Sequence, residues 1–408
     1  MARGKARPPG LLLIGALYIS QGVPLGFAFE ALPVLLRDAG VPLDVLAWLP
    51  LAGIPWIAKF LWAPIVDNCW FRRIGRRRTW ILAMQSLLIV TMLLLATLPF
   101  SAEMAPWLLA VLVLGIVFAA TQDTATDGLA AGSLHGVALA RANGLQIGGM
   151  MVGFMVGGAG LLLLAEAVGH VMGLTVLAAV LAAALLPVLF WEEPEAMPAA
   201  DRRAQIRNTL RRPGAWLLIA ISLAGAAFHA GGQSLSRLVL VDAGWSPGAV
   251  GAIGLLGGTA MIVLGAPVAA RLVARIGIWQ AAVVGLAVVG LAFLLWIRVA
   301  AGETASAFVY AAIVVLGAGG GIVSVAFSTL AMRFAGTSRQ EGTDVTVLQS
   351  AFVLGETLSS AGAVGIAAAT GYRDVFLIGL ATLACSLLLV RWIGRRPAAG
   401  LYFSREAA

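Results

Sequence analysis

The chain has 408 residues, of which 61% are hydrophobic and 11% charged, and its formal net charge is +8. Because a soluble domain carries about 25% charged residues, this composition excludes an ordinary soluble protein and predicts a polytopic membrane protein. The basic residues lie in short loops, so the positive charge does not indicate a nucleic-acid partner. The two cysteines, Cys69 and Cys385, imply no disulfide framework.

Apolar stretches of about 20 residues predict twelve membrane-spanning helices, since that length crosses the hydrocarbon core of a bilayer. The predicted spans cover residues 11–36, 46–68, 79–99, 105–130, 142–165 and 168–191, followed by 214–241, 248–274, 277–298, 305–333, 344–370 and 373–391. The first span follows Arg3, Lys5 and Arg7, but it is too long for a signal peptide and lacks a clear cleavage site. We therefore expect it to be retained.

The placement of lysine and arginine predicts how the spans are oriented. Most of the 27 basic residues fall in the two terminal segments and in the loops on the same side of the membrane as those segments. The positive-inside rule then places both termini in the cytoplasm, which requires an even number of crossings and agrees with twelve.

The chain divides into two similar halves. The polar segment 192–213 predicts a cytoplasmic linker between an N-terminal six-helix bundle, residues 1–191, and a C-terminal six-helix bundle, residues 214–408. Short motifs recur in the same order at an offset of about 203 residues: Asp38-Ala39-Gly40 with Asp242-Ala243-Gly244, Ala63-Pro64 with Ala266-Pro267, and Ile74-Gly75 with Ile276-Gly277. Since repeats are typical of secondary transporters, we expect an all-α fold of two pseudo-symmetric bundles.

Ionisable residues inside the spans of the first half predict a functional site. Asp123 and Asp127 lie one helical turn apart, and each carboxylate costs at least ~2.5–3.5 kcal/mol in hydrocarbon. Lys59 lies in a span interrupted by prolines and needs a partner, for which Asp123 is the natural candidate; the alternative is that Lys59 snorkels to the cytoplasmic face. Gln122, beside Asp123, joins the candidates for contact with substrate or proton. Glu30 is a further candidate, unless the first span ends early and leaves it at the outer surface.

Polar residues also occur inside the predicted spans of the second half. His229, Gln233 and Arg237 are spaced four residues apart, so they share one helix face and predict a cavity wall. Arg237 could bind a carboxylate or phenolate, and His229 could relay a proton, although a neighbouring helix could equally satisfy the histidine. Gln349 and Glu356 share a face of span 344–370, and Glu356 is a second candidate for proton coupling.

Asp67, followed by Arg76 and Arg77, resembles the signature loop of the major facilitator superfamily. In that family an aspartate and arginines lock helix ends together in one state; the alternative is a positive-inside loop, which needs the arginines but not Asp67. Asp127 lies nearer the cytoplasmic end than Asp123, and Arg333 stands at the matching depth of the second half. This symmetry predicts a charge-paired cytoplasmic gate that includes both residues.

Four stretches together resemble the AmpG-type branch of this superfamily: residues 17–26, 32–40, 59–67 and 121–127. That branch contains muropeptide permeases, acetyl-CoA carriers and the RhtX/FptX-type siderophore uptake permeases. AmpG-type muropeptide permeases usually extend beyond twelve spans, so twelve spans favour the siderophore group. The Glu341-Gly342-Thr343-Asp344 segment before span 344–370 agrees with that group.

The resemblance implies a secondary transporter that imports a siderophore or ferric siderophore across the bacterial inner membrane by alternating access. Muropeptide import is the alternative, and a non-transporting membrane enzyme or receptor is an alternative of another class. The sequence contains no phosphate-binding loop, metal-ligand cluster or nucleophile triad, so we expect neither enzymatic activity, nor a cofactor, nor a metal site. The expected partners are the small-molecule substrate, the lipid bilayer and protons, and the expected state is a monomer.

Overall fold

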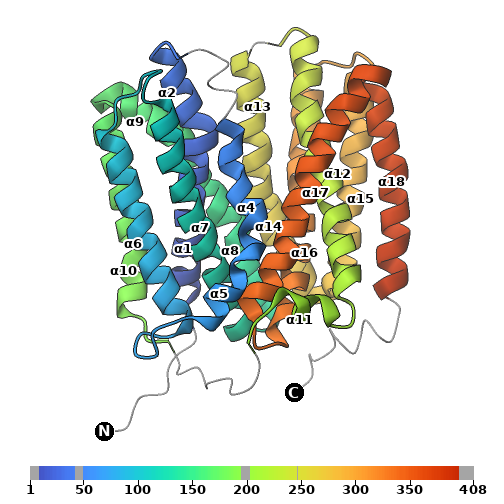
Figure 1. The fold of residues 1–408 in the computed structure, drawn as a ribbon. Helices are drawn as coiled ribbons and strands as arrows, with labels where there is room; N and C mark the ends of the chain where they lie inside the picture. Colours follow the sequence, from blue (N-terminus) through green and yellow to red (C-terminus); the bar gives the residue numbers. More distant parts are fainter. Residues whose placement is uncertain (1–8, 42–48, 194–202, 246, 395–408) are drawn as a thin grey trace. The chain divides into compact units, whose positions relative to one another are not determined.

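A computed structural model of the chain describes residues 9–41, 49–193, 203–245 and 247–394. All twelve predicted spans coincide with helical segments of these residues (Figure 1). Nine of the described segments are long and apolar enough to cross a membrane, and two shorter apolar helices, Leu51–Leu61 and Ala215–Ala224, lie within two further predicted spans. The predicted all-helical class is therefore confirmed.

The first six spans are built from the following elements: α1 (Leu11–Gly26), η1 (Phe27–Ala31), α2 (Leu32–Asp38), η2 (Leu49–Gly53), α4 (Ile54–Ala58), η3 (Lys59–Leu61), α5 (Ala63–Asn68), α6 (Arg76–Thr97), α7 (Ala105–Ser133), α8 (Gly136–Met155), η4 (Val156–Gly160), α9 (Leu161–Val168) and α10 (His170–Phe190). The remaining elements are α11 (Ile206–Arg211), α12 (Ala215–Asp242), α13 (Pro247–Ala260), η5 (Met261–Gly265), α14 (Ala266–Ile276), α15 (Ile278–Ala300), α16 (Ser306–Gly336), α17 (Glu341–Thr370) and α18 (Tyr372–Gly394).

The second span is broken into short pieces rather than forming one helix. Pro55 lies in the first turn of α4 and Pro64 in the first turn of α5, and between them the chain tightens into the 3₁₀ turn η3. Proline lacks an N–H group and clashes with the preceding turn, so it starts helices and does not continue them. The irregular backbone places Lys59 on η3, between the two breaks.

The repeated motifs adopt the same local structure in both halves. Gly40 and Gly244 follow the ends of α2 and α12 with φ of 81° and 82°, and the residue after each donates its N–H to a carbonyl five residues earlier. Gly75 and Gly277 precede α6 and α15, again with positive φ. A residue with a Cβ rarely adopts this conformation, so the recurring glycines mark equivalent helix ends.

The chain forms two compact units, each of which is described by itself. Unit 1 comprises Met1–Leu134, Gly149–Arg211 and Ala335–Ser350, whereas unit 2 comprises His135–Gly148, Arg212–Phe334 and Ala351–Ala408. The start of α17 thus belongs to unit 1 and the start of α8 to unit 2. The division into bundles 1–191 and 214–408 stays a prediction.

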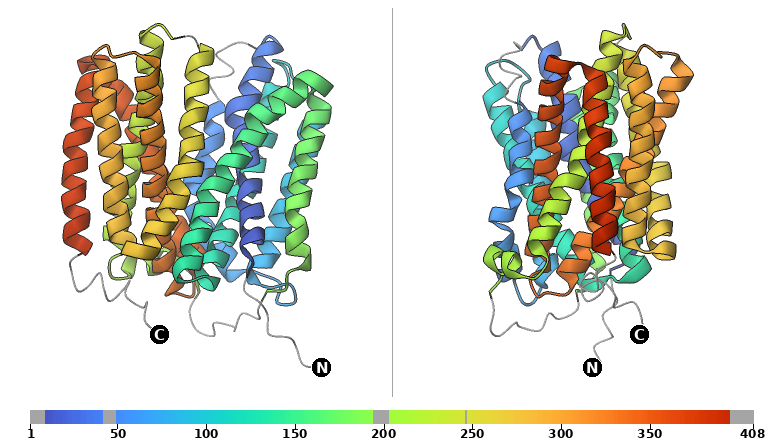
Figure 2. Two further views of the ribbon diagram at one scale, coloured as in Figure 1. Left: turned by 180° about the vertical axis from the view of Figure 1, so that it is seen from behind. Right: turned by 90° about the vertical axis from the view of Figure 1, so that its right-hand side faces the viewer.

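In unit 1, α6 packs against both α7 and α10, and α1 packs against α7, α10 and η4 (Figures 1 and 2). The contact of α1 with α8 and η4 depends on glycine. A Cβ at Gly153 would lie 1.9 Å from the carbonyl oxygen of Ile19, and one at Gly157 would lie 2.0 Å from that of Val23. Helix backbones can approach this closely only where side chains are absent, as the four-residue glycine spacing predicted.

In unit 2, α15 lies beside α18 and also packs against α12 and α14 (Figure 2). Trp296 of α15 is fully buried, and its ring stacks on Phe376 of α18 at a centroid distance of 6.2 Å. Large apolar side chains also remain exposed on many helices; α10, for example, buries Leu177 and exposes Met172 and Phe190. Helices that are apolar on both faces suit a lipid environment.

Candidate functional site

A buried ion pair occupies the interior of unit 1. Lys59 of η3 donates a hydrogen bond from Nζ to Oδ2 of Asp123 on α7, and the two side chains are 0% and 1% exposed. Lys59 Nζ also donates to Oε1 of Gln349, at the start of α17, over 2.8 Å, and it lies 4.9 Å from the ring centroid of Trp56. The structure confirms Asp123 as the partner of Lys59, and it shows that Lys59 does not snorkel to a surface.

Asp127, one turn after Asp123, is held by a residue that the sequence analysis missed. Tyr18 of α1 is fully buried and donates its hydroxyl proton to Asp127 Oδ1 over 2.7 Å. The α7 turn therefore presents two carboxylates, one facing an ammonium group and one facing a phenol. A tyrosine within the apolar segment 11–26 is the signal that could have been noticed, because a buried phenol needs a hydrogen-bond partner.

Several buried polar atoms on α1 and α7 have no hydrogen-bond partner among the described residues. They are Asp123 Oδ1, Gln122 Oε1 and both amide atoms of Gln21, and these side chains are at most 1% exposed. A buried carboxylate oxygen without a donor is destabilising. Asp123 Oδ1 therefore offers a position at which a proton or a donor group of a ligand would be stabilised.

Amide and hydroxyl groups extend this polar region toward α6 and α10. Gln122 Nε2 donates to Ser20 Oγ over 3.4 Å, and Ser20 Oγ donates to Gln85 Oε1 over 3.2 Å. Gln85 Nε2 in turn donates to the carbonyl oxygen of Leu181 over 2.8 Å. These contacts fix Gln122 on the face of α7 that meets α1.

A second charged cluster lies where α5 ends and α6 begins. Asp67 Oδ1 is 2.8 Å from Arg76 Nη2 and 2.6 Å from Arg77 Nη1. Glu341 Oε2, at the first residue of α17, accepts from the same two arginines over 3.0 and 2.9 Å. Thr343 donates its N–H and its hydroxyl to Asp67 Oδ2 over 2.7 and 2.6 Å.

This cluster joins three of the predicted gating residues to Glu341 and Thr343, for which the sequence analysis predicted no role in a gate. Glu193 was also missed. Its carboxylate accepts the backbone N–H groups of Arg77 and Arg78 over 2.8 to 3.0 Å and so caps the N-terminus of α6, which begins with three arginines. The helix dipole places partial positive charge at this N-terminus, where the arginines are unfavourable, and the negative carboxylate of Glu193 offsets that repulsion.

Glu30 lies on the π-helical turn η1 and is half-buried. A Cβ at Gly158, on the π-helical turn η4, would lie 2.2 Å from Glu30 Oε2, so the carboxylate packs directly against the backbone of η4. Single π turns inside α-helices are rare and frequently mark functional positions. Glu30 does not join Lys59 or Asp123 in a hydrogen bond that the structure gives, and its predicted role stays a prediction.

In unit 2, His229, Gln233 and Arg237 lie on α12 as predicted, but the side chains of the first two are outside the described residues. Arg237 is exposed, and a Cβ at Gly254 of α13 would lie 3.3 Å from its Nη2. Glu356 is half-buried on α17. The predicted cavity wall therefore stays a prediction.

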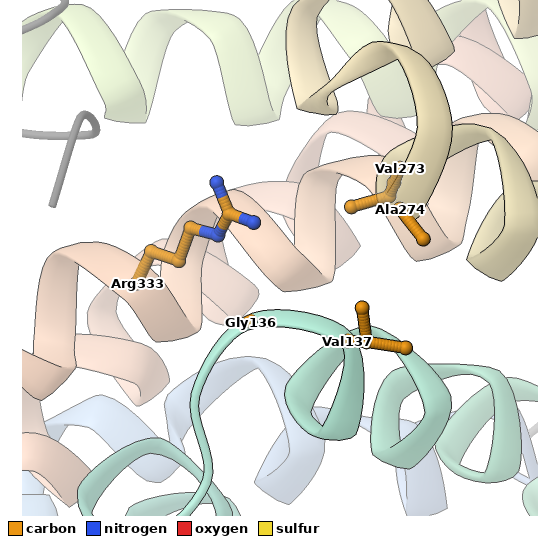
Figure 3. A pocket seen from close by; sticks show the side chains of 5 residues that line it. All are labelled: Gly136, Val137, Val273, Ala274 and Arg333. Carbon is orange, nitrogen blue, oxygen red and sulfur yellow. The ribbon is translucent and has the colours of Figure 1, made fainter. Parts of the chain in front are cut away.

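Arg333 lines a cavity of about 260 Å³ together with Gly136, Val137, Val273 and Ala274, all of unit 2 (Figure 3). Asp127 belongs to unit 1 and Arg333 to unit 2. Their pairing in a gate stays a prediction.

Comparison with known proteins gives the family. Residues 14–343 match the profile of the Major Facilitator Superfamily. The anhydromuropeptide permease of Escherichia coli (strain K12) is 25% identical over 279 residues, which cover 66% of this chain and 56% of the permease. An uncharacterized Schizosaccharomyces pombe protein is 34% identical over 148 residues, which cover 34% of this chain and 27% of that protein. The chain thus matches 56% of the length of the permease and 27% of the length of the Schizosaccharomyces pombe protein.

Solved structures agree with the family. The human organic anion transporter MFSD10 (TETRAN) is 16% identical and has a TM-score of 0.72, with 93% of this chain and 98% of that chain covered. A bacterial homologue of the iron transporter ferroportin, in an outward-facing state with soaked iron, is 17% identical and has a TM-score of 0.69, with 96% and 100% covered. At these identities the likeness concerns the fold, and the predicted transporter fold is confirmed.

Proposed function

Because the chain belongs to the Major Facilitator Superfamily, we propose that it is a proton-coupled secondary transporter of the bacterial inner membrane. The cargo that we propose is an anhydromuropeptide, a sugar–peptide molecule with free carboxylates. The similarity to the Escherichia coli permease supports this cargo class. Two ionisable side chains buried inside a helical unit support transport in general, because such groups are costly in a membrane and mark substrate or proton paths.

The observation that carries the proposal is the buried Lys59–Asp123 pair with its unpartnered Asp123 Oδ1. A proton that binds Asp123 cancels the charge that neutralises Lys59. The ammonium group then needs another anion, since a buried unpaired charge costs several kcal/mol. A carboxylate of the cargo can take that place, so that the proton and the anionic cargo bind together.

The second cluster supports a lock at the helix ends. Asp67 and Glu341 hold Arg76 and Arg77, and together they tie the ends of α5 and α6 to the first turn of α17. In the proposed cycle these ion pairs break and re-form. The low exposure of Arg77 and Asp67, 4% and 0%, makes that step sensitive to loss of either partner.

A siderophore is the competing cargo, expected from the resemblance to the RhtX/FptX-type permeases. The relatives reported above do not favour it, since the permease among them is named for anhydromuropeptides. Ferric siderophores can also carry anionic groups that Lys59 would accept. The two cargoes therefore have to be compared directly.

The test is uptake by the purified full-length chain in liposomes with an inward proton gradient. We expect a labelled anhydromuropeptide to accumulate, and we expect a protonophore, but not removal of sodium, to abolish the accumulation. Accumulation of a ferric siderophore in its place would contradict the proposed cargo while keeping the transport mechanism. Accumulation that survives the protonophore and requires sodium would contradict proton coupling.

A further inference from the structure

The cavity beside Arg333 is not used by the proposed transport chemistry. Gly136 and Val137 open α8, Val273 and Ala274 lie in the last turn of α14, and Arg333 lies in the last turn of α16 (Figure 3). All the lining residues therefore lie at helix ends, so the cavity is located at one end of unit 2. Its volume of about 260 Å³ is many times the space that one water molecule needs.

Positive charge gathers around this cavity. Arg141 follows Val137 by one turn of α8, so the two share a helix face. Arg271 and Arg275 flank Val273 and Ala274 along α14, and Arg141, Arg271 and Arg275 are all exposed. These three arginines thus lie within about one helical turn of lining residues, on the helices that contribute those residues to the cavity.

Negative charge lies elsewhere in the described part of unit 2. The end of α12, the α15–α16 connection and the start of α18 are opposite to the helix ends that form the cavity, and Glu356 lies within α17. The acidic residues at those opposite ends are Asp242, Glu303 and Asp374. Among the described residues of unit 2, the charged side chains on the helix ends that line the cavity are therefore arginines, and a cluster of positive charge favours an anion.

We propose that this cavity binds the phosphate group of an anionic phospholipid headgroup, with Arg333 as the principal contact. A guanidinium group presents two parallel N–H donors that match two phosphate oxygens. Val137 of α8 and Ala274 of α14 face one another in Figure 3, and with Val273 they supply an apolar side for the glycerol backbone. A basic pocket between helices at their ends is where a headgroup lies in a membrane.

A free phosphate-containing molecule shares this chemistry, and the experiment separates the two sources. The full-length chain, purified in a neutral detergent, is titrated with phosphatidylglycerol, phosphatidylcholine or inorganic phosphate, and bound lipid is counted by native mass spectrometry. We expect phosphatidylglycerol to bind with preference over phosphatidylcholine, and we expect Arg333→Gln to weaken that binding by about tenfold.

Two further variants make the test decisive. Ala274→Phe fills the cavity while keeping Arg333, and it should weaken phosphatidylglycerol binding as well. Arg298→Gln removes an exposed arginine at the opposite end of the same unit, where it pairs with Glu303 at 3.6 Å, and it should bind like the wild type. Unchanged binding in both Arg333→Gln and Ala274→Phe would overturn the proposal. Displacement of the lipid by inorganic phosphate at equal concentration would overturn the lipid as the natural source.

Discussion

At the scale of single residues, the interior of unit 1 is held together by the pairing of buried charged and polar side chains. Lys59 and Asp123 could be paired from the sequence because a lysine inside a span needs a counter-charge and few acids are available at that depth. Tyr18 and Asp127 could not, because they are 109 residues apart and tertiary packing alone brings them together. The same holds for Arg77 and Glu341, which are 264 residues apart.

The Tyr18–Asp127 hydrogen bond has a matched control in the chain. Tyr372 donates to Asp242 over 2.6 Å in the same chemical arrangement, but on an exposed surface. We expect Tyr18→Phe to lower the free energy of unfolding by about 1–3 kcal/mol, because it removes a hydrogen-bond donor from a buried carboxylate. Tyr372→Phe should change stability by less than about 1 kcal/mol, since water replaces the lost donor.

Thermal unfolding of both purified variants in one detergent measures this difference. Equal decreases of the unfolding temperature in the two variants would mean that burial around Asp127 does not increase the free-energy cost of losing the hydrogen bond.

At the scale of elements, the length of the apolar stretches predicted where the helices lie. The 3₁₀ and π-helical turns that interrupt them depend on the local sequence and packing. The twelve predicted spans matched helical segments because the bilayer sets a length that the sequence displays directly. The prolines of the second span were visible in the sequence, and they explain why that span is broken. The 3₁₀ turn that carries Lys59 could not be predicted from them. The π-helical turns η1, η4 and η5 carry no comparable sequence signal.

The close approach of α1 to α8 predicts that a side chain added at a contact glycine lowers the stability of unit 1. Gly153→Ala places a Cβ 1.9 Å from the backbone oxygen of Ile19, so the helices must separate and unit 1 should lose stability. Gly251→Ala, in α13, meets nothing within 4 Å and should be neutral or slightly stabilising, because alanine favours the helix by about 1 kcal/mol.

The measurement is the unfolding midpoint of both variants, together with the yield of folded protein. A Gly153→Ala variant as stable as Gly251→Ala would show that α1 and α8 do not pack at the distance described.

At the scale of the whole molecule, the sequence predicted the family and the presence of buried charges, whereas its prediction of the cargo is not supported by the relatives. Hydropathy and the recurring motifs predicted a transporter fold, and the family match confirms that fold. In the proposed mechanism, cargo selection depends on side chains from distant segments, such as Gln349 beside Lys59, which meet only in the folded protein. The expectation of a siderophore rested on resemblance alone, and the relatives moved the proposal toward anhydromuropeptides.

The cluster of Asp67, Arg76, Arg77 and Glu341 gives a prediction for transport as a whole. Glu341→Gln removes two ion pairs at 15% exposure and should increase hydrogen exchange of the amides that open α6 and α17. Glu303→Gln removes a largely exposed pair with Arg298 and should leave exchange unchanged, because exposed pairs contribute about 0–1 kcal/mol.

Hydrogen–deuterium exchange with mass spectrometry measures both variants under identical conditions. Unchanged exchange in Glu341→Gln would contradict a lock at these helix ends.

The central claim is that Asp123 carries the proton that moves with the cargo. The most direct measurement is proton entry into liposomes on addition of anhydromuropeptide, followed with a trapped pH dye, for the wild type, Asp123→Asn and the control Asp38→Asn, whose carboxylate is exposed at the end of α2. The account predicts cargo-dependent acidification for the wild type and Asp38→Asn, and none for Asp123→Asn. Acidification by Asp123→Asn at the wild-type rate would contradict it.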